Sequence, residues 1–207
     1  QFGKFDVVIH CAAVGGSRLV TDDDDVFHDN IQMFLNLVRN KDSFDRLIHF
    51  GSGAQKVDAG PYGFSKRVID GMIGELDNFY NIIIYGLFDE NELDTRFIKS
   101  CINNCLNGGD VDVYENKIMD FFHMKDLESV VNHYIDEFNP PKTIDCSYEL
   151  QMSLYDIAKY IKDYMGSVVD MNYTKSTGGI NYRGKNTEYL NKIIKGNFMD
   201  RLDKNIE

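Results

Sequence analysis

Apolar runs and helical repeats alternate along the first half of the chain. Nearly continuous apolar segments, which are typical of strands buried on both faces, occupy residues 5–14, 46–50 and 81–88. Apolar positions at helical spacing predict helices over about 21–38, 62–76 and 94–108. This alternation indicates an α/β fold in which helices cover both faces of a parallel sheet.

Residues that start and stop helices refine these limits. Thr21 precedes four aspartates and is expected to cap the first helix, because acidic side chains suit the positive end of a helix. Pro61 fits the first turn of the second helix. We expect Asp94 to cap the third helix and Gly108 to end it.

The pattern changes near residue 110. Two short strands around a turn at Asn116 precede an amphipathic helix over 124–138, which two prolines end. Ser153 is placed to cap a later helix. The remaining segments predict short strands over 143–147 and 168–173 and a last helix over 187–194. We therefore divide the chain into an α/β part, 1–110, and a smaller mixed α/β lobe, 111–207, with strands interleaved between the two.

Composition narrows the class of partner. The 207 residues carry a net charge of −11, and nucleic acids and anionic membranes attract basic proteins, so neither partner is expected. No apolar run approaches a membrane span and no secretory signal is visible. The scattered cysteines indicate reduced core thiols of a cytoplasmic protein, without a metal site. They are Cys11, Cys101, Cys105 and Cys146.

Two Tyr-x-x-x-Lys pairs raise the question of catalysis. Tyr62 and Lys66 begin a predicted helix ten residues after Ser52, which ends a buried strand. In a parallel sheet these features meet at the carboxyl edge, where ligands bind. Tyr155 and Lys159 have the same spacing, but their helix is expected to be an outer one, and we assign them to packing and solvation.

The surroundings of the first pair suit acid–base chemistry. Residues four apart share a helix face, so Lys66 can lie under Tyr62. A neighbouring cation lowers the pKa of a tyrosine, which lets Tyr62 act as a general base or acid near neutral pH. Ser52 can hydrogen-bond the same reacting oxygen and stabilise its developing charge.

The ordered set DVVIHCAA, LIHFGSGA, YGFSK and IMDFFHMKDL resembles the extended short-chain dehydrogenase/reductase family, within it the NAD-dependent epimerase/dehydratase group that acts on nucleotide sugars. The resemblance covers residues 5 to about 190. Within the group, AAVGGSR followed by GSGA looks most like the GDP-fucose synthase subfamily. The resemblance implies a Rossmann-like doubly wound sheet with a substrate-binding lobe, an NAD or NADP cofactor and a nucleotide-sugar substrate.

The resemblance also implies roles for individual residues. Ser52 would polarise the sugar oxygen, Tyr62 would exchange its proton, and Lys66 would hold the nicotinamide ribose. Asn30 would brace the active-site strands. The segments that line the cofactor would be Cys11, Ala12 and Ala13, and Tyr85, Gly86 and Leu87.

Three departures from the family pattern stand out. The chain lacks the G-x-x-G-x-x-G turn that follows the family's first strand and binds the dinucleotide pyrophosphate. The loop from Ser52 to Tyr62 is short. Ile83 and Met119 stand where the family often has arginine. The remaining candidates for the sugar-nucleotide diphosphate, which could equally be solvated surface cations, are Arg18, Arg96, Lys99 and Arg183.

The first residue is Gln1, and the first strand matches the family's fourth. We therefore expect a fragment that lacks the first strands and the glycine-rich loop. If residues 1–207 were the whole protein, DVVIHC (residues 6–11) would be an exposed apolar edge strand. Family members commonly dimerise, so a homodimer is expected for the full-length protein. Two alternatives stay open: a non-catalytic sugar-nucleotide-binding relative, and an oxidoreductase of the same fold that acts on a non-nucleotide carbonyl compound.

Overall fold

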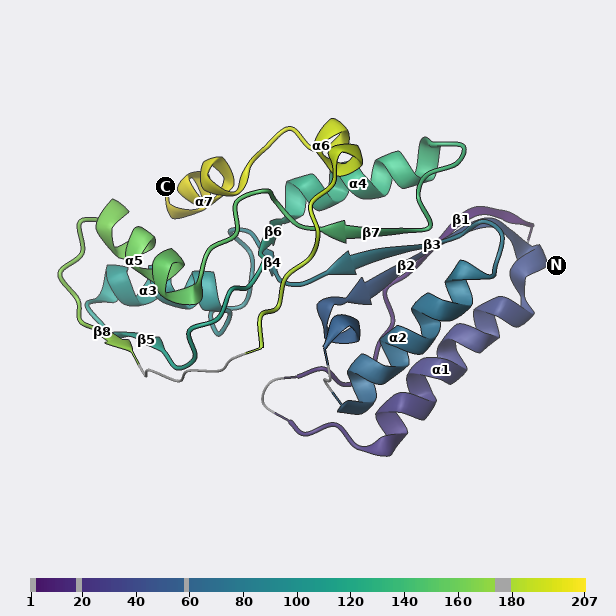
Figure 1. Ribbon diagram of the computed structural model, residues 1–207, viewed down its shortest axis with the longest axis horizontal. Helices are drawn as coiled ribbons and strands as arrows, with labels where there is room; N and C mark the ends of the chain where they lie inside the picture. The colour runs from purple at the N-terminus through teal and green to yellow at the C-terminus, as the bar shows by residue number, and fades with distance from the viewer. Residues whose placement is uncertain (1–2, 18–19, 58–59, 174–179) are drawn as a thin grey trace. The chain divides into compact units, whose positions relative to one another are not determined.

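The computed structural model describes residues 3–17, 20–57, 60–173 and 180–207 (Figure 1). The chain forms two compact units and crosses between them three times. The first unit comprises Gln1–Ile84 and Ser129–Cys146, and the second comprises Tyr85–Glu128 and Ser147–Glu207. The assignment of 1–110 to the cofactor and of 111–207 to the substrate stays a prediction.

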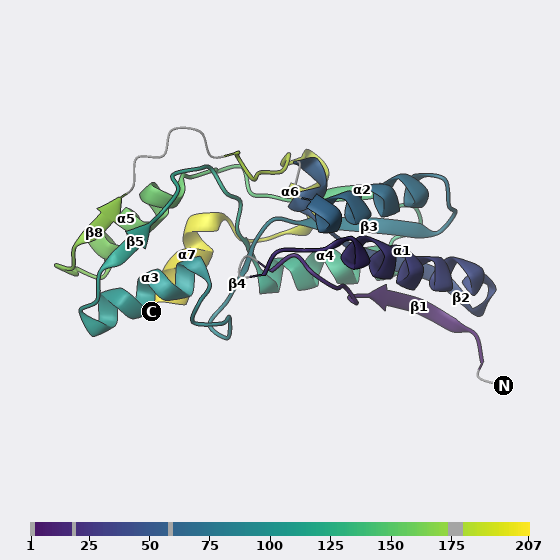
Figure 2. The ribbon, with the colours of Figure 1, turned by 90° about the horizontal axis from the view of Figure 1, so that it is seen from below.

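A parallel four-stranded sheet forms the first unit, which confirms the α/β class (Figures 1 and 2). Its strands lie side by side in the order β1-β2-β3-β7. They are β1 (Phe5–His10), β2 (Phe44–Ser52), β3 (Phe79–Ile84) and β7 (Thr143–Cys146). All three neighbouring pairs are parallel, so every strand ends at the same edge of the sheet.

Helices cover both faces of this sheet. Figures 1 and 2 show α1 (Asp24–Arg39) and α2 (Gly60–Gly74) side by side on one face. A cluster of apolar side chains is buried beneath them: Phe34, Phe44, Leu47, Ile69, Ile73 and Phe79. On the other face, Tyr134 of α4 (Met124–Asp136) packs edge-on to the ring of Tyr80, at 5.7 Å between centroids. The burial of alternate strand residues under different helices explains the continuous apolar runs.

The first strand differs in part from its prediction. It ends at His10 and is not buried on both faces, because it is an edge strand that pairs with β2 alone among the described residues. Its Phe5 and Ile9 side chains are 55% and 42% exposed. The expected exposed apolar edge is therefore confirmed.

Two predicted caps are wrong and two are confirmed. Asp23, not Thr21, caps α1, because the helix starts at Asp24 and the Asp23 carboxylate accepts from the Val26 amide. Asp94 lies before α3 (Phe97–Asn107) and accepts instead from the Asn103 side chain, at 3.0 Å. Gly108 ends α3 in the left-handed conformation that glycine favours. Ser153 caps α5 (Leu154–Tyr164).

The second unit is mixed. It holds two small parallel sheets, one of β4 (Leu87–Phe88) with β6 (Phe122–His123) and one of β5 (Val111–Val113) with β8 (Met171–Tyr173). The two strands expected around Asn116 therefore pair with distant partners and not with each other. Two C-terminal helices follow, α6 (Glu188–Ile193) and α7 (Phe198–Ile206). The second of them was not predicted.

The four cysteines differ in their exposure to solvent. Three of the four thiols are buried, but Cys11 is exposed, because it follows the edge strand directly. The prediction of a core thiol is wrong for Cys11.

Within the described ranges, no helix combines the length and the apolar character that crossing a membrane requires.

Candidate functional site

Ser52 ends β2 and begins a tight turn. Its hydroxyl accepts from the Ala54 amide at 3.2 Å, and its own amide donates to Gln55 Oε1 at 3.2 Å. This reciprocal capping box starts the short helix η2 (Gly53–Lys56). At Gly51 a side chain would not fit, since a Cβ atom there would lie 2.5 Å from Asn81 Oδ1. The strand end is therefore held in one backbone path.

Tyr62 lies in the first turn of α2, against the loop that follows β1. A Cβ atom on Gly16 would come within 2.9 Å of the Tyr62 ring, so only glycine allows this approach. Gly16 also has a φ of +73°, and its amide donates to Asp22 Oδ1 at 3.0 Å. The loop after β1 and the start of α2 thus come together, as expected at the carboxyl edge of a parallel sheet.

Lys66 lies one helical turn beyond Tyr62 and is 4% exposed. Its Nζ donates to the Phe50 carbonyl at 2.8 Å and is 5.7 Å from the centroid of the Tyr62 ring. Burial lowers the pKa of Lys66 to about 8, although Cys11 acts in the opposite direction. The ammonium is therefore charged at neutral pH and lies close to the tyrosine.

Asn30 joins three segments of the first unit. Its Oδ1 accepts from the Val14 amide and its Nδ2 donates to the Val14 carbonyl, both at 2.9 Å. The same Nδ2 donates to Ser65 Oγ at 3.2 Å, and that hydroxyl donates to the Tyr62 carbonyl at 2.7 Å. Asn30 thus ties the loop after β1 and the first turn of α2 to α1, which suits the expected bracing role.

The other Tyr-x-x-x-Lys pair has different surroundings. Lys159 is exposed and forms an ion pair with Asp163, one turn further along α5. The Tyr155 ring packs on Tyr173, at 5.1 Å between centroids. The spacing is shared, but only Lys66 is buried against backbone and ring atoms.

The remaining cofactor segments belong to different units. Cys11, Ala12 and Ala13 are exposed residues of the loop after β1, in the first unit. Tyr85 and Gly86 belong to the second unit, where the Gly86 carbonyl accepts from the Phe122 amide at 2.8 Å. Leu87 lies beside them in β4.

The basic residues predicted to bind the sugar-nucleotide diphosphate each have different contacts. Arg18 lies outside the described residues. Arg96 is exposed just before α3, and the Lys99 ammonium donates to the Glu90 carbonyl at 2.8 Å. Arg183 donates to Gln151 Oε1 at 3.2 Å. Their part in binding a diphosphate stays a prediction.

Sequence reasoning missed two buried histidines beside the site. His10 and His49 approach each other with 2.8 Å between their Nδ1 atoms, and His49 Nε2 is 3.4 Å from Lys66 Nζ. Each histidine interrupts an apolar strand run, which is the signal that could have drawn attention to them.

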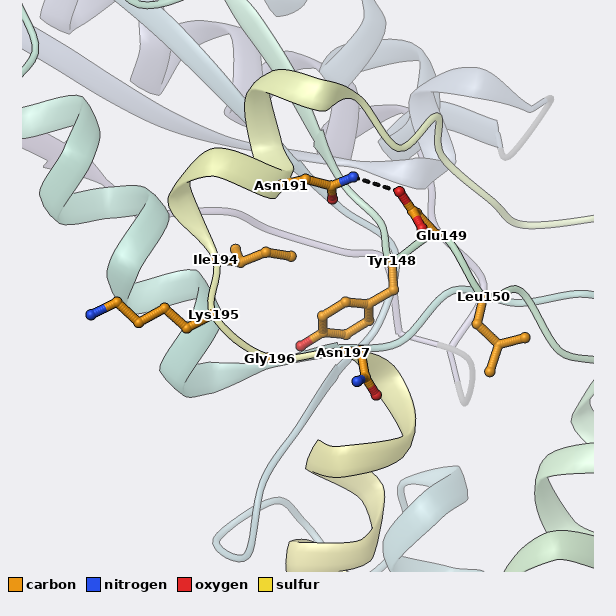
Figure 3. Close-up of a pocket in the computed structure, with 8 residues that line it drawn as sticks. All are labelled: Tyr148, Glu149, Leu150, Asn191, Ile194, Lys195, Gly196 and Asn197. Atoms are coloured by element: carbon orange, nitrogen blue, oxygen red, sulfur yellow. Dashed lines mark hydrogen bonds between the residues drawn. The ribbon is translucent and has the colours of Figure 1, made fainter.

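A depression of about 430 Å³ lies in the second unit, and Figure 3 shows its lining. Asn191 donates to Glu149 across it, at 2.7 Å. It contains none of the candidate residues, since it is lined by Tyr148, Glu149, Leu150, Asn191, Ile194, Lys195, Gly196 and Asn197. In the part of the chain that the structure describes, no group of three or more acidic, histidine or cysteine side chains is placed to hold a metal ion.

Three solved structures that match this chain are nucleotide-sugar enzymes. UDP-N-acetylglucosamine 4-epimerase from Bacillus cereus matches with a TM-score of 0.76 at 18% identity, over 96% of this chain and 75% of that one. UDP-glucuronic acid 4-epimerase from Bacillus cereus, in complex with UDP-glucuronic acid and NAD, matches at 0.77 and 16%, over 97% and 74%. GDP-L-fucose synthetase from Naegleria fowleri matches at 0.74 and 17%, over 97% and 75%.

The TM-scores of these matches show a common fold, the Rossmann-like α/β architecture. No match was found among the curated proteins. The model of the NAD dependent epimerase/dehydratase family matches residues 1–146, which is most of the chain. That match and the ordered motifs lead to one conclusion: the chain belongs to the NAD dependent epimerase/dehydratase family, within the extended short-chain dehydrogenases/reductases.

Proposed function

We propose that this protein is an NAD(P)-dependent nucleotide-sugar epimerase, dehydratase or reductase in which Tyr62 is the acid–base residue. The observation that carries the proposal is the burial of Lys66 beneath Tyr62, at the sheet edge where Ser52 ends β2. Strongly perturbed groups at such an edge are typical of functional sites.

The residues present fit the nicotinamide side of the cofactor. Lys66 has three N–H donors, and two are directed at the Phe50 carbonyl and at His49, so among the described residues one is left for a ribose hydroxyl. Gly16 packs directly against the Tyr62 ring, where a Cβ atom would come within 2.9 Å of it. The glycine-rich turn is absent from these 207 residues, so we assign none of them to the pyrophosphate.

The nicotinamide would supply or accept the hydride, and the side chains would handle the proton. Tyr62 would take the hydroxyl proton when the sugar is oxidised and return it when the ketone is reduced. The Lys66 ammonium would stabilise the Tyr62 phenolate that accepts this proton, and Ser52 would donate to the same sugar oxygen.

A non-catalytic relative that binds sugar nucleotides is the second candidate. Two positions where the family often carries arginine hold buried apolar side chains, Ile83 and Met119, at 0% and 4% exposure. Neither can bind a diphosphate. The short η2 turn, where the family has a longer loop, equally suits the third candidate, an oxidoreductase that acts on a small carbonyl compound.

The homodimer stays part of the proposal. Ile69 and Ile73 of α2 lie in the core between the helices and the sheet, so they are not available to a partner. The outward side of the α1 and α2 pair carries a stacked aromatic pair, Phe27 and Phe64, with 4.9 Å between centroids. Phe64 is 52% exposed, which makes it the better candidate for a dimer contact.

The test compares Tyr62→Phe with Tyr155→Phe in the protein expressed from its complete reading frame. Turnover of UDP-, GDP- and dTDP-sugars is measured with NAD or NADP. We expect Tyr62→Phe to lower turnover by about 10²- to 10⁴-fold with folding retained, the usual contribution of an acid–base residue, and Tyr155→Phe to match the wild type. Wild-type turnover in Tyr62→Phe would rule out Tyr62 as the acid–base residue, whereas binding of a sugar nucleotide without turnover by the wild type would favour the non-catalytic relative. Turnover of a carbonyl compound that UDP and GDP do not inhibit would favour the third candidate.

A further inference from the structure

A row of polar side chains crosses the sheet beneath α2. His10 pairs in register with His49, His49 with Asn81, and Asn81 with Thr143, so the row spans all four strands. His49 and Asn81 are fully buried, and His10 is 8% exposed. A buried polar row costs free energy unless its groups are hydrogen-bonded, so it calls for partners.

The partners come from α2, one helical turn apart. Asp70 Oδ1 accepts from Asn81 Nδ2 at 2.7 Å and from Thr143 Oγ1 at 3.0 Å. Lys66 Nζ lies 3.4 Å from His49 Nε2. The Asp70 carboxylate therefore accepts hydrogen bonds from Asn81 and Thr143, and the Lys66 ammonium contacts the half of the row that holds the histidines.

The chemistry of Lys66 sets the direction of the hydrogen bonds. An ammonium has only donors, so His49 Nε2 accepts from it and the ring proton of His49 lies on Nδ1. That proton is then donated to His10 Nδ1, 2.8 Å away, and the ring proton of His10 lies on Nε2. The result is one continuous chain from Lys66 to the carboxyl end of the edge strand.

Both imidazoles are neutral in this arrangement. Burial, together with the charge of Lys66, lowers the pKa of His10 to about 4 and the pKa of His49 well below its ordinary value. The charged group that contacts the pair is Lys66. Asp70, one turn further on α2, contacts Asn81 and Thr143, and Cys11 acts on Lys66 from the loop after β1. From α1 the aromatic ring of Phe34 closes the site, 5.7 Å from that of His49.

We propose that His49 positions Lys66 and that His49 and His10 form a path along which a proton passes between Lys66 and the end of β1. Lys66 gives one proton to His49 Nε2, His49 Nδ1 passes its proton to His10 Nδ1, and His10 Nε2 releases one to water. Lys66 is left neutral, both imidazoles stay neutral with exchanged tautomers, and the reverse sequence restores the start. The proposal rests on the proposed function only in taking Lys66 to be the partner of Tyr62.

Two substitutions separate positioning from proton transfer. In His49→Gln the amide oxygen can still accept from Lys66, but no proton can be relayed. In His49→Leu both properties are lost. His123→Gln is the matched control, since His123 is a buried histidine of the second unit at 4% exposure.

NMR on the full chain provides the readouts: the titration of Lys66, the ¹⁵N shifts that report histidine tautomers, and the exchange rate of the Lys66 ammonium protons with water. We expect His49→Leu to lower the pKa of Lys66 by about one pH unit, because a charged hydrogen bond is lost, and His49→Gln to preserve it. Both should slow ammonium exchange at least about tenfold, and His123→Gln should change neither.

An unchanged Lys66 pKa in His49→Leu, or wild-type exchange in His49→Gln, would overturn the proposal. Should His49→Leu fail to fold, His10→Gln takes its place: it should slow the exchange and leave the pKa of Lys66 as it is, and any other result counts against the path. None of these readouts needs sugar or dinucleotide, so a failure of the proposed enzyme activity would be seen separately.

Discussion

The two Tyr-x-x-x-Lys pairs show how surroundings decide the chemistry of identical residues. Lys66 is buried, with its pKa lowered to about 8, whereas Lys159 is exposed, and its hydrogen bond and ion pair with Asp163 raise its pKa. Only a lysine whose pKa lies near neutrality can change its charge under ordinary conditions. Spacing alone therefore does not identify a catalytic pair, and burial does much of the discrimination.

The buried histidines should make stability depend on pH. The ordinary histidine pKa of 6.5 applies to the unfolded chain, whereas burial in the folded chain lowers the pKa of His10 to about 4 and the pKa of His49 well below its ordinary value. The unfolded chain therefore binds more protons between these values, and stability present above pH 6.5 is lost as the pH falls toward 4. We expect the free energy of unfolding, measured with urea, to fall between pH 6.5 and pH 4. This fall should be smaller in His10→Gln than in the wild type by about 1 to 3 kcal/mol. The same pH dependence of the free energy of unfolding in both proteins would contradict the prediction.

Gly16 should be a position where a single methyl group disturbs Tyr62. Gly16→Ala places a Cβ atom 2.9 Å from the ring and strains a backbone with a φ of +73°. We expect a loss of about 1 to 2 kcal/mol in the free energy of unfolding, together with reduced turnover. Gly71→Ala is the control, because a Cβ atom there meets nothing within 4 Å and α2 should gain about 0.5 to 1 kcal/mol. Chemical denaturation and activity assays measure both effects, and equal behaviour of the two variants would refute the prediction.

At the scale of elements, α7 is held by a buried ion pair. Arg201 of α7 donates to both carboxylate oxygens of Asp126, at 2.8 and 2.6 Å, and the Tyr148 hydroxyl donates to the same group. Asp126 is fully buried. Burial acts to raise the pKa of Asp126, but the hydrogen bonds from Arg201 and Tyr148 outweigh it and lower the pKa.

Breaking this pair should be costly. Arg201→Met leaves a buried carboxylate without its cation, which we expect to lower the free energy of unfolding by about 3 to 5 kcal/mol. The exposed pair of Lys159 and Asp163 provides the contrast, and Lys159→Met should cost far less than Arg201→Met, because solvent screens the exposed pair. Thermal and denaturant unfolding compare the two variants. Similar losses in both would show that burial of the carboxylate is not what matters.

Much of the element order in the first unit could be predicted from sequence, because strands, helices and glycine stops are local patterns. The partners of β5 and β6 could not, since their pairing depends on residues far away in the chain. The same holds for the site. Ser52, Tyr62 and Lys66 stand out by their order along the chain, but His10 and His49 meet only through the register of two strands, 39 residues apart. Single-sequence patterns do not determine register.

At the scale of the whole molecule, an NAD-dependent family member needs a local site that attracts the cofactor. An acidic chain with a net charge of −11 attracts an anionic dinucleotide only through a local site, and Lys66 is the cation best placed beside the proposed acid–base residue. The central claim is therefore that Lys66 contacts a nicotinamide cofactor.

Calorimetric titration of NAD and NADP into the protein, expressed from its complete reading frame, tests this claim most directly. Lys66→Met and Lys159→Met are titrated beside the wild type. We expect the wild type to bind one of the two dinucleotides, Lys66→Met to bind it about 10- to 100-fold more weakly, and Lys159→Met to bind it as the wild type does. Failure of the wild type to bind either dinucleotide, or equal affinity in the two variants, would contradict the account.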